Sequence, residues 1–390
     1  MNDSDGKHFR LLTLVQLANG LRGAVISPIL ALFIHGHGFT LTEIGFLGTA
    51  GILGWFIFEP VMGVFADRFK KKYLISFAIV CSSIVYALYP YATNLLHFSI
   101  LAFSMSSVMS AYTISVKALA AELIPPENRG KTYGRYTAVI SLGGIIGPTV
   151  GGYIAEQYGM SLPFYIAALL GGVSLLAVGF MKIDGGSSSR ENISEGIDLR
   201  GLFTPTLMGL YLVRAIFMFN LMFRTYSLPI YLNEAASFSA GATEIGVFLS
   251  VVSVSSTISK VFIGDVVDRL GTRLMMTSSL CVLSITYFLL TRLTGLESLY
   301  IIGLLQGVTI AVAELSMMIQ LMSIIPEGRT GMVMGLYSEA ENVGAIIASP
   351  FLGYMYDSQG PENTILALSA ILIIDALIAW AAMRKRLETS

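Results

Sequence analysis

Ionisable side chains interrupt several stretches of this chain that are otherwise apolar. They are Arg22, Lys117, Arg214, Arg224, Lys260 and Glu314. A lone charge at membrane depth costs roughly 3 kcal/mol on insertion scales, so each one should face water, a partner or a ligand. Arginine binds carboxylate and phosphate oxygens through paired hydrogen bonds, and a carboxylate can take up and release a proton. These residue types indicate anion binding and proton exchange.

The composition indicates the solvent around these side chains. Hydrophobic residues make up 54% of the 390, charged residues make up 13%, and the mean hydropathy is +0.72. Twelve apolar stretches reach the roughly 20 residues that a bilayer-spanning helix needs. They lie near 11–34, 43–64, 73–91, 97–121, 135–155, 162–182, 205–232, 243–264, 273–292, 298–324, 333–355 and 364–383. We therefore expect an all-α membrane protein with 12 transmembrane helices.

The chain repeats itself at an offset of 201 residues. Thr42-Glu43-Ile44-Gly45 returns as Thr243-Glu244-Ile245-Gly246, and Gly152-Tyr153 returns as Gly353-Tyr354. A polar Gly/Ser-rich stretch separates the two copies. The repeat predicts two pseudo-symmetric six-helix bundles, residues 1–183 and 201–390, joined by a cytoplasmic linker at 184–200.

The distribution of cations predicts the orientation. Most of the 24 lysines and arginines lie in the loops of one side, whereas the other side has only Arg292. The positive-inside rule then places both termini in the cytoplasm. The dispersed loop cations and the net charge of −1 indicate no nucleic-acid partner.

Two motifs resemble those of the major facilitator superfamily over essentially the whole chain. The first motif runs from Gly63 to Lys71 and resembles G-x-x-x-D-R-x-G-R-K, with Lys70 where the pattern has glycine; its second copy keeps that glycine as Gly271. The resemblance implies a conformational latch in which the acid faces the start of helix 11. The latch residues are Gly63, Asp67, Arg68, Gly264, Asp268 and Arg269.

The second motif resembles the exporter-associated signature G-x-x-x-G-P-x-x-G-G of helix 5. It comprises Gly143, Gly147, Pro148, Gly151 and Gly152. Glycines four residues apart flatten one helix face for close packing, and proline kinks the helix. Within this family the motif favours export, although the arginine that many drug and proton antiporters carry early in helix 4 is absent here, where Ala102 stands. Helix 4 instead presents one polar face with Ser106, Ser110, Thr113 and Lys117.

The resemblance also implies a central cavity lined by helices 1, 4, 7 and 10, which hold most of the charges. Arg22 and Arg224 lie within one residue of repeat-equivalent positions, each a few residues beyond an asparagine, Asn19 or Asn220. They are either a pair that grips an anionic substrate or members of an ion-pair network with Glu59 or Glu314. The predicted substrate site is Asn19, Arg22, Thr113, Lys117, Asn220, Arg224 and Glu314, and Arg214 is expected to be structural.

Proton coupling requires a group that changes charge during transport. Glu314 is the first choice because it lies mid-helix on the same face as Gly303, Gly307 and Ala311, and Glu59 is the second. No nucleotide-binding loop and no metal-ligand cluster occurs, so no enzyme activity, cofactor or metal is expected.

The resulting hypothesis is a secondary transporter that works by alternating access, a proton-coupled exporter of a small amphipathic or anionic organic solute. An organic-anion or phosphorylated-metabolite exchanger and a non-transporting membrane sensor are the alternatives. Its partners would be the solute, protons or a counter-ion, and the lipid bilayer. We expect a monomeric, multi-pass protein of the inner or plasma membrane.

Overall fold

A computed structural model describes residues 3–123, 129–181, 203–326 and 329–383. Those residues form helices and no strands, and ten of the helices are long and apolar enough to cross a membrane. The chain is therefore an all-α, multi-pass membrane protein, as predicted. The count of twelve spans and the orientation of the termini stay predictions.

The elements follow the sequence pattern closely. The first six predicted spans correspond to α1 (Asp3–Ile26), α2 (Leu30–His35), α3 (Leu41–Arg68), α4 (Lys71–Leu88), η1 (Tyr89–Tyr91), α5 (Leu95–Leu123), α6 (Arg129–Tyr158) and α7 (Leu162–Gly179). The others correspond to α8 (Pro205–Met222), the π-helical turn η4 (Phe223–Ser227), α9 (Leu228–Glu234), α10 (Ala242–Leu270), α11 (Thr272–Leu290), α12 (Leu296–Ile324), α13 (Thr330–Gln359) and α14 (Pro361–Ala382).

The chain divides into two compact units. Unit 1 comprises Met1–Phe39, Phe46–Ile193 and Ala240–Ser250, and unit 2 comprises Thr40–Gly45, Ser194–Ser239 and Val251–Ser390. The first turn of α3 thus belongs to unit 2 and the first turns of α10 belong to unit 1. The predicted linker, 184–200, lies outside the described residues.

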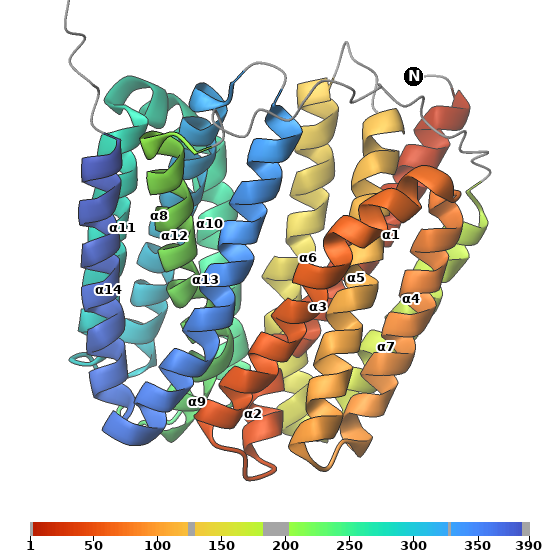
Figure 1. The fold of residues 1–390 in the computed structure, drawn as a ribbon. Coiled ribbons are helices and arrows are strands. Elements are labelled where there is room, and N and C mark those ends of the chain that lie inside the picture. The colour runs from red at the N-terminus through yellow and green to blue at the C-terminus, as the bar shows by residue number, and fades with distance from the viewer. Residues whose placement is uncertain (1–2, 124–128, 182–202, 327–328, 384–390) are drawn as a thin grey trace, which may run out of the picture. The chain divides into compact units, whose positions relative to one another are not determined.

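In unit 1, α1 packs against α6 and α7, and α4 packs against α5 and α7; Figure 1 shows these helices running alongside one another. Phe9, Leu12 and Val15 of α1 meet Ile75 and Ile79 of α4 in the buried core. At one end of the unit, Lys72 Nζ donates to the carbonyls of Gly179 and Met181, at 3.1 and 2.5 Å. A cation at the carboxyl end of α7 complements the helix dipole.

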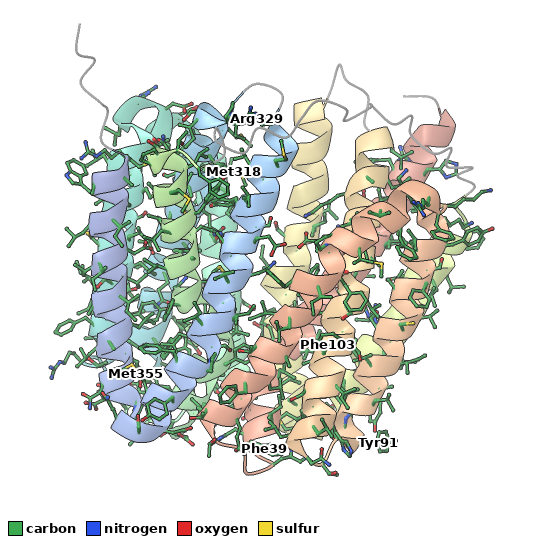
Figure 2. The ribbon with its side chains drawn as sticks, in the orientation of Figure 1. Phe39, Tyr91, Phe103, Met318, Arg329 and Met355 are labelled. Carbon is green, nitrogen blue, oxygen red and sulfur yellow. The ribbon has the colours of Figure 1, made fainter. Side chains whose placement is uncertain are left out.

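In unit 2, α8 packs against α13 and α14, and α11 packs against α12 and α14. Arg273, the repeat equivalent of Lys72, donates from Nε to the Trp380 carbonyl at 2.9 Å and lies over the Trp380 ring. In Figure 2, Met318 of α12 and Arg329 lie at one end of this unit and Met355 of α13 lies at the other. In each unit, a cation therefore donates to backbone carbonyls near the C-terminal end of the last helix.

Three predicted spans are not single α-helices: 73–91 ends in the 3₁₀ turn η1, and two others are interrupted further inside. The stretch 11–34 is divided into α1 and α2 at residues 27–29, and 205–232 contains the π-helical turn η4 between α8 and α9. Pro28 and its repeat equivalent Pro229 stand at these breaks. Proline lacks the N–H that would continue the helical hydrogen bonding, which accounts for the interruption of the α-helix at both positions.

Candidate functional site

Arg22 is fully buried inside unit 1, between α1, α4 and α7. Its Nε donates to the Ala167 carbonyl at 2.8 Å, and its terminal nitrogens donate to Asn19 Oδ1, Ser82 Oγ and Ser83 Oγ at 3.3, 3.0 and 2.9 Å. The guanidinium also lies 5.2 Å from the centre of the Tyr86 ring. These partners are all neutral oxygens and one aromatic ring. None of these partners is a carboxylate, and the geometry favours a structural role for Arg22.

The same position in unit 2 holds Phe223 rather than an arginine, because an offset of 201 from Arg22 leads to residue 223. Phe223 is also fully buried, and its ring meets the Tyr287 ring edge-on at 5.6 Å. Tyr287 is the repeat equivalent of Tyr86, and Leu283 replaces Ser82. An apolar pair therefore fills in unit 2 the space that a hydrogen-bonded arginine fills in unit 1.

Arg224 is the next residue and lies in the π-helical turn η4, half-buried. Adjacent helical residues differ by about 100° around the axis, so Arg224 does not follow Phe223 into the buried position. Among the described residues it makes no hydrogen bond and no ion pair, although it interacts electrostatically with Tyr287. Arg22 and Arg224 are therefore not geometrical equivalents, which corrects the expectation of a symmetric pair. Asn220, one turn earlier, is buried and accepts a hydrogen bond from the Tyr287 hydroxyl at 2.6 Å.

Glu314 forms an ion pair with Lys260 across α12 and α10, with 3.0 Å between Oε2 and Nζ. Both side chains are partly open, at 37% and 50% exposed. Glu59, the repeat equivalent of Lys260, lies half-buried in α3 beside Pro60. The pair thus brings an acid and a cation together in a partly open part of unit 2.

Arg214 pairs with Glu341 of α13 at 2.9 Å and lies against the Tyr337 ring at 5.5 Å. Its side chain is only 13% exposed. Arg214 also interacts electrostatically with Glu314. These contacts support its expected structural role and join it to the Lys260–Glu314 pair within unit 2.

The predicted polar face of helix 4 is divided in α5. Ser110 is fully buried and donates to the Ser107 carbonyl at 2.8 Å, whereas Thr113 is half-buried and Lys117 is exposed. Ser106 is also half-buried, so Ser110 is the one residue of this face that is closed to a ligand.

The loop motif differs between its two copies for a conformational reason. Gly271 has φ +86°, where glycine is favoured, while Lys70 has φ −61° and an extended backbone. A Cβ on Gly63 or Gly264 would meet no described atom within 4 Å, so neither glycine is required for close helix packing here. Arg68, Asp268 and Arg269 are exposed. The Asp67 side chain lies outside the described part, and the latch stays a prediction.

The helix 5 motif packs α6 closely against α1. A Cβ on Gly143 would lie 3.0 Å from backbone atoms of Gly20 and Leu21, and Cβ atoms on Gly147 and Gly151 would overlap Ala24 and Val25. Gly152, on another face, meets the backbone of Ala242. The flattened helix face that the glycine spacing predicts is present, within unit 1.

Three polar residues of unit 2, Lys260, Tyr287 and Gln306, had weak signals in the sequence. Lys260 was visible as a cation within a span, but its pairing with Glu314 depends on the packing of α10 against α12. Tyr287 could have been found from the 201-residue offset to Tyr86. Gln306 is fully buried with neither amide atom bonded, and no pattern singled it out. Within the described residues no group of three His, Cys, Asp or Glu could hold a metal ion.

Comparisons with known proteins identify the family. The model described as Major Facilitator Superfamily matches residues 12–234 and 210–389. The uncharacterized MFS-type transporter MJ1560 of Methanocaldococcus jannaschii is 25% identical over 377 residues, which is 92% of this chain and 94% of the relative. The quinolone resistance protein NorA of Staphylococcus aureus is 26% identical over 219 residues, and this match spans 52% of the chain and only about half of NorA, 54%.

Solved structures share the fold. A bacterial homolog of the human lysosomal transporter Spinster has a TM-score of 0.83 and 13% identity, with 98% of this chain and 97% of that one covered. The nucleoside transporter NupG has a TM-score of 0.78 and 13% identity, with 98% of each chain covered. With its helical fold and the family match over nearly its whole length, the chain is a transporter that belongs to the Major Facilitator Superfamily.

Proposed function

We propose that the protein is a proton-coupled exporter of small amphipathic organic solutes that works by alternating access in the inner or plasma membrane. The observation that carries this proposal is the Lys260–Glu314 ion pair. It places a carboxylate at membrane depth on α12, partly open and neutralised by a cation rather than sealed in the core. A group that exchanges a proton must be reached by water, and separation of Glu314 from Lys260 during the cycle would favour its protonation.

Two further observations support export. The glycine motif of α6 packs against α1, as the exporter-associated pattern predicts. The relative NorA is a quinolone resistance protein, and export of a drug is one way to provide resistance. Glu59 remains the second proposed proton carrier, and the Gly63–Arg68 and Gly264–Arg269 loops remain the proposed latch.

The test is transport of Hoechst 33342 into inside-out vesicles that contain the purified protein, driven by a pH gradient. Glu314→Gln should abolish accumulation against the gradient while leaving dye binding intact, because the amide keeps the shape and cannot titrate. Glu297→Gln makes the same change at an exposed position in the first turn of α12, serves as the control for charge removal, and should retain the proton dependence. Undiminished proton-driven accumulation by Glu314→Gln would eliminate Glu314 as the carrier.

An exchanger of organic anions is the second candidate function, and one observation favours it. Arg224 has no hydrogen-bonding or ionic partner among the described residues, so its charge is available to a substrate. Counterflow distinguishes the two functions. Transport that depends on an anion inside the vesicles and ignores the pH gradient would replace the first proposal with the second.

A further inference from the structure

A buried guanidinium bonds the polar groups around it in unit 1, and an aromatic ring occupies the equivalent place in unit 2. In unit 1 the guanidinium of Arg22 donates four hydrogen bonds and satisfies Asn19, Ser82, Ser83 and the Ala167 carbonyl. In unit 2 the Phe223 ring takes that place and donates nothing. The repeat therefore shows where unit 2 lacks the buried cation of unit 1, and Asn220, the counterpart of Asn19, accepts from the Tyr287 hydroxyl instead.

Two buried amides are among the side chains of unit 2 whose polar atoms make no hydrogen bond within the described residues. Asn220 Oδ1 is engaged by Tyr287, but Nδ2 has no partner, and neither Nε2 nor Oε1 of Gln306 has one among the described residues. Both side chains are at most 1% exposed. Buried amides without partners are costly, so a site that holds two of them invites a ligand that can bond to them.

The two amides lie at the same depth in the unit. The Thr272 hydroxyl at the start of α11 donates to Gln320 near the end of α12, which sets the register of these consecutive antiparallel helices. Equal numbers of residues counted from this bonded pair reach the same level in the two helices. Tyr287 lies fifteen residues after Thr272 in α11, and position 305 lies fifteen residues before Gln320 in α12. Gln306 is therefore level with Tyr287, to which Asn220 is bonded.

Arg224 lies beside this level. It follows Asn220 by four residues, so both lie on one side of the helix, and it interacts electrostatically with Tyr287. The π-helical turn that carries it is a rare element often found at functional sites. Its guanidinium is half-buried and has no carboxylate partner in the described part of the chain, so it needs water or an anion at membrane depth.

We propose that Arg224, Asn220 and Gln306 form a one-sided binding site for the carboxylate or phosphate group of an amphipathic organic solute, and that Arg22 takes no part in it. The inference rests on the proposed transport function and deepens it by assigning the anion site to unit 2. Arg224 supplies the paired donors that fit two acidic oxygens. Asn220 Nδ2 adds a neutral donor, and Gln306 can donate to the acid or accept from a neighbouring hydroxyl.

The test compares isosteric probes at equilibrium. Binding of 1-naphthoate, 1-naphthyl phosphate and neutral 1-naphthamide is measured by calorimetry on the purified full chain in phosphatidylcholine nanodiscs. The wild type should prefer at least one of the two anions to the amide. Arg224→Gln should lower the affinity for that anion by about tenfold or more, because a paired charge contact is lost. The affinity for naphthamide should change less than about twofold. Arg292→Gln removes an exposed cation of unit 2 and should change neither affinity.

Asn220→Asp tests the same site without removing the arginine. It keeps the acceptor for Tyr287 and introduces a carboxylate four residues from Arg224, which should compete with the probe and weaken anion binding by a similar factor. Its melting temperature should stay near that of the wild type, which separates loss of binding from loss of folding.

The outcomes are distinct. Equal affinity of the wild type for the anions and the amide, or equal losses in Arg224→Gln and Arg292→Gln, would overturn the inference. Competition by phosphatidylglycerol added to the nanodiscs would assign the site to a lipid headgroup and overturn its assignment to the solute. Export of Hoechst 33342 without any anion preference would support the proposed function and reject only this site. Anion preference without transport would support this site and reject the proposed function.

Discussion

At the scale of single residues, one duplicated position shows two solutions to the same packing problem. Arg22 with Ser82 fills it through hydrogen bonds in unit 1, and Phe223 with Leu283 fills it with apolar side chains in unit 2. Replacing a buried charged group by apolar groups of similar volume can be neutral when all its partners change together. The two copies therefore differ at this pair, while Asn19, Ser83 and Tyr86 keep their residue types as Asn220, Ser284 and Tyr287.

This exchange predicts a specific coupling. Arg22→Phe leaves the Ala167 carbonyl and three side-chain oxygens without their donor, and should lower the free energy of unfolding by about 3 kcal/mol. Adding Ser82→Leu, which copies unit 2, should recover about 1 kcal/mol or more, because neighbouring residues are not additive. Thermal unfolding of the two variants in detergent measures this. Ser76→Leu, one of the other hydroxyls of α4, is the control for the second substitution and should recover nothing.

At the scale of the helices, two carboxylates related by the 201-residue offset bind helix N-termini. Asp357 in the last turn of α13 accepts from the Leu41 and Thr42 amides of α3 at 3.1 and 2.7 Å, within unit 2. Glu156 in the last turn of α6 accepts from the Thr243 amide of α10 at 3.0 Å, within unit 1. An acid at its own helix C-terminus is unfavourable, so the neighbouring N-terminus accounts for its presence there.

Each carboxylate should protect only the helix end that it binds. Glu156→Ala should speed amide hydrogen exchange in the first turn of α10 by about fivefold, corresponding to about 1 kcal/mol for a lost cap, and leave the first turn of α3 unchanged. Asp357→Ala should do the opposite. The two variants control for each other in one mass-spectrometric experiment. Equal acceleration at both helix ends would show general loosening and contradict the local account.

The glycine face of α6 makes a second prediction at this scale. Gly151→Ala would place a methyl group against the Val25 backbone, which cannot withdraw like a flexible side chain, so stability should fall by about 2 kcal/mol or more. Gly172→Ala is the matched control in α7, because its Cβ would meet nothing within 4 Å. There the better helix propensity of alanine should raise stability by up to about 1 kcal/mol. Melting temperatures that move the same way in both variants would contradict this assignment of the glycine face.

At the scale of the whole molecule, periodicity and the repeat predict the helices and their equivalence, but not which face each residue occupies. The membrane class followed from apolar length, and the close packing of α6 followed from its glycine spacing. The supposed symmetry of Arg22 and Arg224 was wrong because a one-residue shift rotates a helical side chain by about 100°, which sequence proximity conceals. The pairing of Glu314 with Lys260 depends on tertiary packing, which no local pattern encodes.

The composition of the two units predicts how the halves of the chain behave apart. Residues 1–183 lack Ala240–Ser250 of unit 1, and residues 201–390 lack Thr40–Gly45 of unit 2. Gly152 and Gly353 each meet backbone from the missing segment, at Ala242 and Leu41, and Glu156 and Asp357 would lose their partners. Each half expressed alone should therefore melt well below the intact chain, whereas the two halves co-expressed as separate polypeptides should purify together with most of the stability restored.

The control is the intact chain with a cleavable site inserted at 184–200, cut after purification. If either isolated half melts at the temperature of the cut chain, the segments 40–45 and 240–250 contribute nothing to the units that contain them.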